Sequence, residues 1–269
     1  MAEPQDNPNF ADPEVLAFLK GQTGILDNDQ LKGHVVAVQK KAAAVFDYPC
    51  IQRFEFIKLK INKLQSAYEH VLELGLGNDL RKIAVDGFPA KNMIASDLRQ
   101  DFWNLGHELF RSTPQTFPVA FLAGDAFDDN FLALHPLLDA PLTSAAPDPH
   151  SVTSLNSLRA RLSAIHSASV FHLFGEAEQL LLARKLAGLL LPRSGSMIFG
   201  CHGGQPTKGY VSDVAGQRMF CHSSESWRDL WDGEVFERGS VRVKTHMENF
   251  GKYFKNIDFY MLFWSVERL

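Results

Sequence analysis

The chain has 269 residues, of which 45% are hydrophobic and 22% are charged, enough for one large α/β domain or two small domains. Its net charge of −4, without a basic run interleaved with aromatic residues, argues against a nucleic-acid surface. Three cysteines without metal-type spacing, an acidic N-terminus unlike a signal peptide and no apolar run of membrane-spanning length predict a cytoplasmic protein with no metal site and no membrane span.

The N-terminal quarter of the sequence predicts helices. Residues 1–11 are polar and contain two prolines, which predicts a disordered tail. Residues 12–65 are predicted to form a helical cap. Its first helix begins at Asp12-Pro13-Glu14 and runs to about residue 20, because a capping Asp precedes a proline at the first helical position. A second helix is expected over residues 28–45. Residues 51–61 suit a helix or a strand, and we favour a helix.

The domain predicted for residues 66–269 opens with a strand, a glycine turn, a helix and a second strand. The apolar residues 71–74 run into Gly75-Leu76-Gly77, residues 78–86 favour a helix, and the second strand ends in Ser96-Asp97. This order is typical of a nucleotide-binding βαβ unit, whose glycines allow close backbone approach and whose acid binds ribose hydroxyls. Position 80 is Leu, not the third glycine of that motif, so this stretch alone is equally compatible with an ordinary strand-turn-helix.

The rest of the chain alternates between strands and helices and then closes on two strands. Alternation predicts a mostly parallel sheet with helices on both faces, and the closing pair predicts an antiparallel hairpin at the sheet edge. Residues 128–160 form a predicted insertion that is either functional or mobile, because long connections are uncommon in compact domains. The other expected elements are a helix at 101–110, a strand at 119–123, a strand at 162–166, a helix at 176–191, a strand at 196–200, a glycine-rich loop at 201–217, a helix at 223–231 and strands at 241–247 and 259–266.

Several short groups of residues, spread from about position 46 to the end, carry a family resemblance. They include Tyr48-Pro49-Cys50-Ile51, Asn78-Asp79-Leu80-Arg81-Lys82, Ala95-Ser96-Asp97-Leu98, Gly124-Asp125-Ala126-Phe127, Ile165-His166-Ser167-Ala168-Ser169 and Glu225-Ser226-Trp227. In these groups the chain resembles fungal S-adenosylmethionine-dependent methyltransferases of secondary metabolism. The resemblance implies a Rossmann-like class I methyltransferase sheet, mostly parallel with a C-terminal antiparallel hairpin and preceded by the N-terminal helical cap.

The sequence departs from this family at the glycine turn. Relatives have a helix, then a separate strand that ends in an Asp-x-Gly-Cys-Cys-x-Gly type turn, whereas here residues 71–75 run directly into residues 76–79. Either residues 71–75 are recruited as the first strand, with a shortened turn, or the strand is lost and cofactor binding is impaired. We favour recruitment, because Val-Leu-Glu-Leu-Gly-x-Gly matches the general class I pattern.

The resemblance also implies a cofactor site for S-adenosylmethionine. Glu73 would bind the cofactor's amino group, and Gly75 and Gly77 would lie along its methionine part. Asp97, after the second strand, would bind the ribose, and the group that begins at Asp125, after the third strand, would contact the adenine. The simpler alternatives are a surface acid, a plain tight turn, a helix N-cap and a turn-stabilising Asp. The residues assigned to the cofactor are Glu73, Gly75, Gly77, Asp97, Leu98, Asp125, Ala126, Phe127 and His166.

His172 is the candidate catalytic residue, because it follows the fourth strand, where the ligand crevice of such a sheet lies. It could orient an acceptor oxygen, take its proton, or simply pack beside its aromatic neighbours. A carboxylate acceptor would need no base, because it is ionised at neutral pH. His202 and His222 each follow a cysteine and could form a substrate wall or lie on the surface. A zinc site is disfavoured, because adjacent Cys-His pairs suit tetrahedral ligation poorly.

These observations predict an S-adenosylmethionine-dependent methyltransferase that acts on a small apolar secondary metabolite. Oxygen is the expected target, with methyl ester formation as one form of the reaction. The main alternative is a degenerate methyltransferase fold that binds no cofactor and serves as an accessory or binding protein. A nicotinamide oxidoreductase is disfavoured, because it would require a third glycine and a longer alternating tail.

Overall fold

The computed structural model of the chain describes residue 10, residues 12–48, residue 51 and residues 71–74, 77–212, 218–254 and 257–269. The chain divides into two compact units, the first made of Met1–Ser66 with Gly75–Ala123 and the second of Ala67–Leu74 with Gly124–Leu269. Residues 75–123, which we assigned to the methyltransferase domain, therefore group with the predicted helical cap.

The first unit begins with two capped helices, α1 (Pro13–Thr23) and α2 (Asn28–Val45). The predicted cap is confirmed, because the Asp12 carboxylate accepts hydrogen bonds from the backbone N–H of Glu14, at 2.9 Å, and of Val15, at 3.3 Å. Helix α1 ends later than predicted, because Gly24 rather than Gly21 adopts the left-handed C-cap conformation. Its backbone N–H then bonds to the carbonyl of Lys20 at 2.9 Å.

Apolar side chains from the N-terminal helices and from the end of α5 (Gln100–Leu109) form the main core of this unit. Of the predicted disordered tail, the described residues include only Phe10, which is 4% exposed and belongs to this core. Residues 52–61 of the predicted third helix lie outside the described residues. The buried members of the core are Phe10, Val15, Phe18, Leu19, Leu31, Val35, Val38, Leu109 and Phe110.

Two parallel strands complete the first unit. Strands β2 (Met93–Asp97) and β3 (Ala120–Ala123) pair from Ile94 opposite Ala120 to Asp97 opposite Ala123. Helix α4 (Asn78–Val85) and the 3-10 turn η4 (Ala90–Asn92) precede β2. Gly77 is the N-cap of α4 and has a φ of 76°, and a Cβ atom there would lie 2.3 Å from a ring carbon of Trp103. Both the backbone conformation and the packing therefore require glycine at this position.

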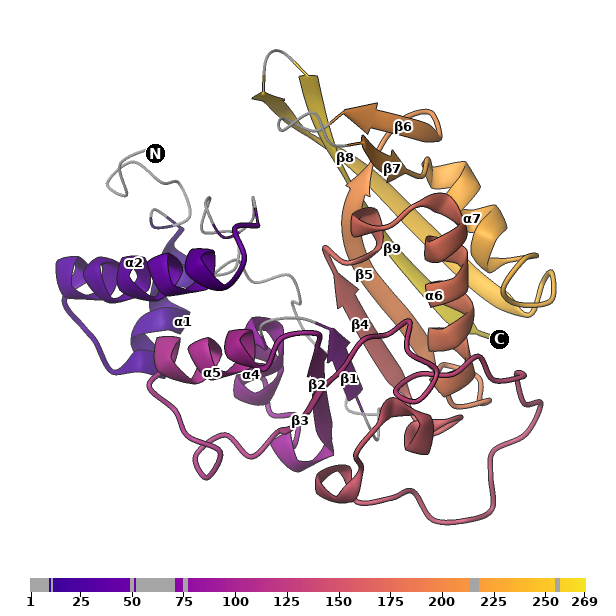
Figure 1. Cartoon of the computed structure of the whole chain (residues 1–269), viewed down its shortest axis with the longest axis horizontal. Helices are drawn as coiled ribbons and strands as arrows, with labels where there is room; N and C mark the ends of the chain where they lie inside the picture. The colour runs from indigo at the N-terminus through magenta and orange to yellow at the C-terminus, as the bar shows by residue number, and fades with distance from the viewer. Residues whose placement is uncertain are drawn as a thin grey trace. The chain divides into compact units, whose positions relative to one another are not determined.

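The second unit is built on five strands in the order β1-β4-β5-β9-β8 (Figure 1). Strands β1 (Val71–Leu74), β4 (Ala164–Ala168) and β5 (Met197–Gly204) are parallel, whereas β9 (Ile257–Arg268) is antiparallel to both β5 and β8 (Val241–Phe254). Residues 71–74 thus form a strand beside β4, as recruitment predicted. The alternative, in which this strand is lost, is wrong.

The predicted glycine-rich loop over residues 201–217 is wrong for residues 201–204 and 209–212, which form strands, whereas residues 205–208 do form a loop between them. Strand β5 continues to Gly204, because its antiparallel pairing with β9 extends to Gly204 opposite Tyr260. Strand β6 (Gly209–Ser212) then pairs with β7 (Arg218–Cys221). Glycine lowers strand propensity locally, but cross-strand pairing with a distant segment outweighs that preference here.

The two α-helices described in the second unit match their predicted positions. Helix α6 (Glu176–Leu189) follows the 3-10 turn η7 (Phe171–Leu173), and α7 (Ser224–Trp231) is capped by Ser223. The predicted insertion contains η5 (Pro149–Ser151) and η6 (Leu155–Leu158). The Asn156 side chain links the two ends of this insertion. It accepts a hydrogen bond from the backbone N–H of Ala133 at 2.7 Å and donates one to the carbonyl of Asp129 at 2.9 Å.

The predicted fold class is confirmed as an α/β chain with N-terminal helices, mainly parallel strands and a C-terminal antiparallel hairpin. The final strand, β9, lies between β5 and β8, so the hairpin is at the edge as predicted and β8 is its outer strand. Within the described ranges, no helix combines the length and the apolar character that crossing a bilayer requires.

Substitution of Gly200 tests how closely the backbones of strands β4 and β5 approach each other. A Cβ atom at Gly200 would lie 1.8 Å from the backbone carbonyl oxygen of Ser167. We expect Gly200→Ala to lower the free energy of unfolding by at least about 2 kcal/mol, because a backbone atom cannot move aside cheaply. Chemical denaturation measures this change.

The matched control for this substitution is Gly33→Ala, at a position in α2 where a Cβ atom meets nothing within 4 Å. It should leave stability unchanged or raise it by about 0.5–1 kcal/mol, because alanine favours helix more than glycine does. Equal stability of Gly200→Ala and the parent protein would contradict the close approach of the two strands.

Candidate functional site

Asp97 ends strand β2 in the first unit, and its carboxyl group is held by its own turn. The Arg99 backbone N–H donates to Asp97 Oδ1 at 2.8 Å. Asp97 does not cap α5, because Arg99 occupies the N-cap position and no side chain caps that helix. Burial raises the pKa of Asp97, while the Arg99 backbone hydrogen bond and the Arg99 charge act in the opposite direction. A partly desolvated carboxylate of this kind gains from further hydrogen-bond donors such as hydroxyl groups.

The other cofactor residues predicted in the first unit lie near strand and helix ends. Gly77 opens α4 in the left-handed conformation, as a tight turn there requires. Leu98 follows Asp97 directly and its side chain is 60% exposed. Gly75 lies outside the described residues, so the part of the shortened turn that the structure describes is Gly77.

In the second unit, β1 and β4 bring two predicted residues into register. Glu73 is the partner of His166, and His166 is in turn the partner of Phe199 on β5. The His166 side chain is 1% exposed, with its ring centroid 5.0 Å from that of Phe199. Glu73 is one residue from the carboxyl end of β1, and His166 is the central residue of β4. Open α/β sheets bind ligands at the carboxyl ends of their parallel strands.

The segment predicted to contact adenine forms a hydrogen-bonded turn. The Phe127 backbone N–H donates to Asp125 Oδ1 at 2.8 Å, and the Asp128 N–H donates to the Asp125 carbonyl at 3.0 Å. Asp125 therefore stabilises its own turn, as the simpler interpretation predicted. The half-buried Phe127 ring packs edge-on against Phe174, with centroids 4.8 Å apart, which leaves an aromatic face beside an exposed acid.

His172 lies in η7, and its side chain is half-buried. The backbone N–H of Gly203 donates to His172 Nδ1 at 3.3 Å. Because Nδ1 accepts this hydrogen bond, the neutral ring carries its proton on Nε2. In this tautomer the outer nitrogen is a hydrogen-bond donor and not a proton acceptor.

His202 and His222 are core residues and do not lie on the surface, being 0% and 2% exposed. Their rings pack against Trp227 with centroids 4.5 and 5.1 Å away. His202 Nδ1 accepts a hydrogen bond from Trp264 Nε1 at 2.9 Å, and His222 Nδ1 lies 2.9 Å from Ser226 Oγ.

Burial keeps both of these histidines neutral. It lowers the pKa of His202 well below its usual value, and the nearby His172 and His222 lower it further. Burial also lowers the pKa of His222 to about 4, with Lys208 acting in the same direction and Glu176 opposing it. Among the residues described, no group of three or more His, Cys, Asp or Glu side chains is arranged to hold a metal ion.

Lys185 is a buried lysine next to the predicted adenine segment that the sequence analysis did not single out. It lies on the buried face of α6 and is 1% exposed. Its ammonium group donates to the Ala126 carbonyl at 3.2 Å and to Asp129 Oδ1 at 3.0 Å. The available signal was a lysine at helical spacing within the apolar stripe that contains Leu182, Leu186 and Leu189.

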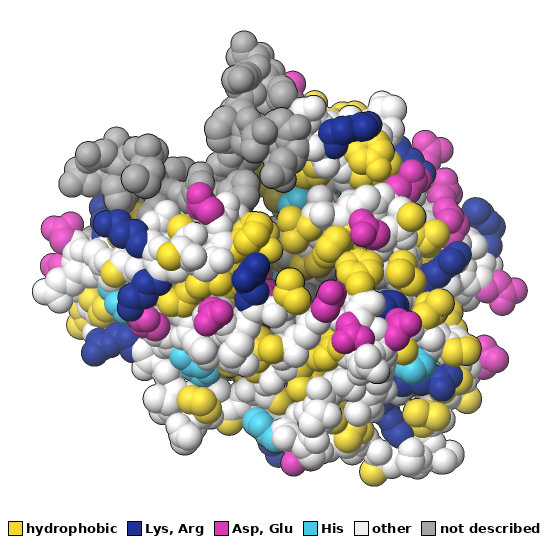
Figure 2. Space-filling model, viewed as in Figure 1, with side chains coloured by type: hydrophobic (Ala, Val, Ile, Leu, Met, Phe, Trp, Pro, Cys, Tyr) yellow, Lys and Arg dark blue, Asp and Glu magenta, His cyan; other side chains and the backbone are white. Residues whose placement is uncertain are grey.

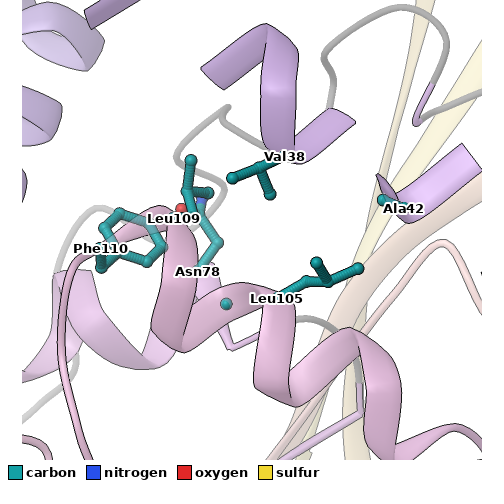
Figure 3. A pocket seen from close by; sticks show the side chains of 7 residues that line it. Val38, Ala42, Asn78, Leu105, Leu109 and Phe110 are labelled. Atoms are coloured by element: carbon teal, nitrogen blue, oxygen red, sulfur yellow. The ribbon is translucent and has the colours of Figure 1, made fainter. Parts of the chain in front are cut away.

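A small apolar pocket of about 20 Å³ lies in the first unit between α2 and α5 (Figure 3). This volume suits about one water molecule and is far too small for a nucleotide-type cofactor. We therefore interpret it as a packing gap. Its lining residues are Val38, Ala42, Asn78, Leu105, Gly106, Leu109 and Phe110.

The charges on the described part of the molecular face in Figure 2 are mixed. Basic and acidic side chains are interspersed there, with hydrophobic side chains gathered between them. A polyanion-binding face would instead concentrate one sign of charge. This face therefore gives no support to a nucleic-acid partner.

Comparison with known proteins agrees with this architecture. Residues 4–57 match the family model described as the meroterpenoid methyltransferase N-terminal domain. The chain is 29% identical over 243 residues to the O-methyltransferase phiE of a fungal species (strain ATCC 74256), covering 83% of this chain and 73% of that protein.

Two further fungal methyltransferases are also similar to the chain over most of its length. The chain is 27% identical to the asnovolin E/chermesin D methyltransferase nvfJ of Aspergillus novofumigatus (strain IBT 16806), covering 87% of this chain and 82% of that protein. It is 29% identical to the methyltransferase ausD of Aspergillus calidoustus, covering 86% and 79%. The predicted resemblance is confirmed, because the chain is similar over most of its length to fungal proteins named as methyltransferases.

The buried His222 makes stability depend on pH. Its folded-state pKa of about 4 lies below its ordinary value of 6.5, so the unfolded chain binds the proton more tightly than the folded chain does. Its contribution to stability is therefore present above about pH 6.5 and is lost as the pH falls through about 4. We expect this residue to account for a fall on the order of 3 kcal/mol in the free energy of unfolding.

Denaturation curves across this pH range test the prediction by comparing the parent protein with His222→Gln. The variant should show a shallower loss of stability toward low pH, whereas His150→Gln, at an exposed position, serves as the matched control. Parallel stability curves for His222→Gln and the parent would contradict the role of this buried imidazole.

Proposed function

We propose that the chain is an S-adenosylmethionine-dependent methyltransferase that methylates an oxygen of a small apolar secondary metabolite, with methyl ester formation as one form of the reaction. Its sequence relationship to fungal methyltransferases, at 29% identity over 83% of the chain for one of them, is the observation that carries this proposal. The N-terminal match to meroterpenoid methyltransferases supports an apolar, terpenoid-like acceptor. A cytoplasmic location, predicted from the sequence, is part of the same proposal.

The described residues fit the chemistry of this cofactor. The half-buried carboxylate of Asp97 at the end of β2 suits the ribose hydroxyls, because a desolvated carboxylate forms strong hydrogen bonds with such donors. The edge-packed Phe127 suits a flat purine ring. Glu73 in β1 remains the candidate partner of the cofactor's amino group, although its side chain lies outside what the structure describes. His166 lies in register with it on β4.

When bound, S-adenosylmethionine supplies an electrophilic methyl group on its sulfonium, and the protein has to bring an acceptor oxygen into line with it. His172 is the residue that we assign to the acceptor. Its Nδ1 accepts the hydrogen bond of Gly203, so its Nε2–H donates a hydrogen bond to the acceptor oxygen. A carboxylate needs no proton removal at neutral pH, which makes a donor more useful at this position than a base.

The first test is cofactor binding. Calorimetry should detect S-adenosylmethionine with the parent protein, and Asp97→Asn should weaken binding about tenfold to a hundredfold, because hydrogen bonds to a charged acceptor are lost. Asp101→Asn removes the same charge at an exposed position in the first turn of α5 and should bind like the parent. A folded parent protein that gives no heat at high micromolar cofactor would reject the enzyme in favour of the degenerate, accessory role.

A second test separates the two roles of His172. If the ring orients the acceptor, His172→Gln should keep kcat within about fivefold, because its amide can still donate a hydrogen bond. His172→Ala should lose about tenfold to a hundredfold. Steady-state rates between pH 6 and pH 8 measure both variants. A parent kcat that rises with pH across this range, together with equal losses in the two variants, would instead identify a general base.

A further inference from the structure

Lys185 carries a charge in the interior of the second unit. The residue is 1% exposed, and it lies among buried apolar neighbours on α6. Burying an ammonium group is unfavourable unless its charge is paired and its hydrogen bonds are satisfied. A leucine or methionine would fill such a helical position at lower cost, so the contacts of the ammonium group have to account for the lysine.

Two hydrogen-bond acceptors of Lys185 belong to one short segment, the one that follows β3. They are the carbonyl of Ala126, at 3.2 Å, and the carboxylate of Asp129, at 3.0 Å. The ammonium nitrogen also lies 5.9 Å from the centre of the Phe127 ring. A single helical side chain thus contacts three of the four residues from Ala126 to Asp129.

The two acceptors differ in environment. The Asp129 side chain is 80% exposed, so solvent screens this ion pair and its contribution is small. The carbonyl of Ala126 belongs to the peptide unit that joins Ala126 to Phe127, and a charge-assisted hydrogen bond to this oxygen fixes how that peptide is turned. The direction of the Phe127 side chain follows from the orientation of this peptide.

We propose that Lys185 is a positioning residue for the adenine end of the cofactor site. It holds the Ala126–Phe127 peptide so that Phe127 presents its ring to the purine, while the hydrogen bond from the Phe127 N–H to Asp125 fixes the other side of the turn. This inference rests on the proposed function, because it assigns Asp125, Ala126 and Phe127 to the adenine of S-adenosylmethionine. Lys185 acts through these residues and does not itself touch the reacting atoms.

The test compares Lys185→Met with Arg184→Met, which makes the same change at the neighbouring position on α6, where the side chain is exposed. The ligands are S-adenosylhomocysteine and 5′-methylthioadenosine, which share adenosine but differ in the amino-acid part. We expect Lys185→Met to raise the Kd of both ligands by the same factor, about tenfold. Arg184→Met should bind both ligands as the parent does. Asp129→Asn should change either Kd by less than about threefold, because its ion pair is exposed.

Kinetics separate positioning from a general structural role. Lys185→Met should raise the KM for S-adenosylmethionine and leave kcat at saturating cofactor within about twofold, with the acceptor KM unchanged. A variant that is merely less stable would lose kcat through its inactive fraction and keep its KM. Lys185→Arg, which retains the charge, should restore the Kd to within about threefold of the parent value.

The outcomes are distinguishable. Unchanged Kd values for both ligands in a folded Lys185→Met protein, or a Kd increase confined to S-adenosylhomocysteine, would overturn the proposal. If Lys185→Met does not fold, Lys185→Gln decides in its place, and an unchanged Kd there overturns the proposal equally. A parent protein that binds neither ligand would reject the proposed function itself, whatever Lys185 does.

Discussion

The antiparallel insertion of β9 between β5 and β8 is the constraint on which the second unit depends. Strand β9 pairs with β5 from Met197 to Gly204 and with β8 along almost its whole length. This pairing keeps the two glycines at the end of β5 in a strand. It also buries Trp264, whose indole N–H donates a hydrogen bond to His202. The carboxyl end of β5 is therefore positioned by a strand that comes last in the chain.

The same pairing determines the chemistry around His172. Gly203 lies in the part of β5 that β9 holds in place, and its backbone N–H fixes Nδ1 of His172 as an acceptor. His202 and His222 are buried, neutral rings that pack on Trp227. Three histidines thus share one region, but two of them serve the core and one can face a ligand. Burial, and not residue type, separates their roles.

The order and type of the elements were largely predictable from the sequence. Capping residues, apolar periodicity and strand-end acids located α1, α2, α6, β2 and β4 to within a few residues, because these signals are local. The main error was the predicted loop after residue 200, where glycines suggested a break but long-range pairing with β9 decided otherwise. The relationship of the chain to fungal methyltransferases was likewise visible in short groups of residues, because such groups are contiguous in the sequence.

The residues of the candidate site likewise fall into those that the sequence located and those that only the tertiary structure placed. The sequence by itself determined which acids follow which strands, since Asp97 and Asp125 are located by the alternation of elements, and it determined the family resemblance. Only the tertiary structure decided that Lys185 is buried against Ala126, that His172 has Nδ1 occupied, and that His202 and His222 belong to the core. The physical reason is that a charge state, a tautomer and a degree of burial depend on neighbours from distant parts of the chain. Local sequence patterns carry no information about those neighbours.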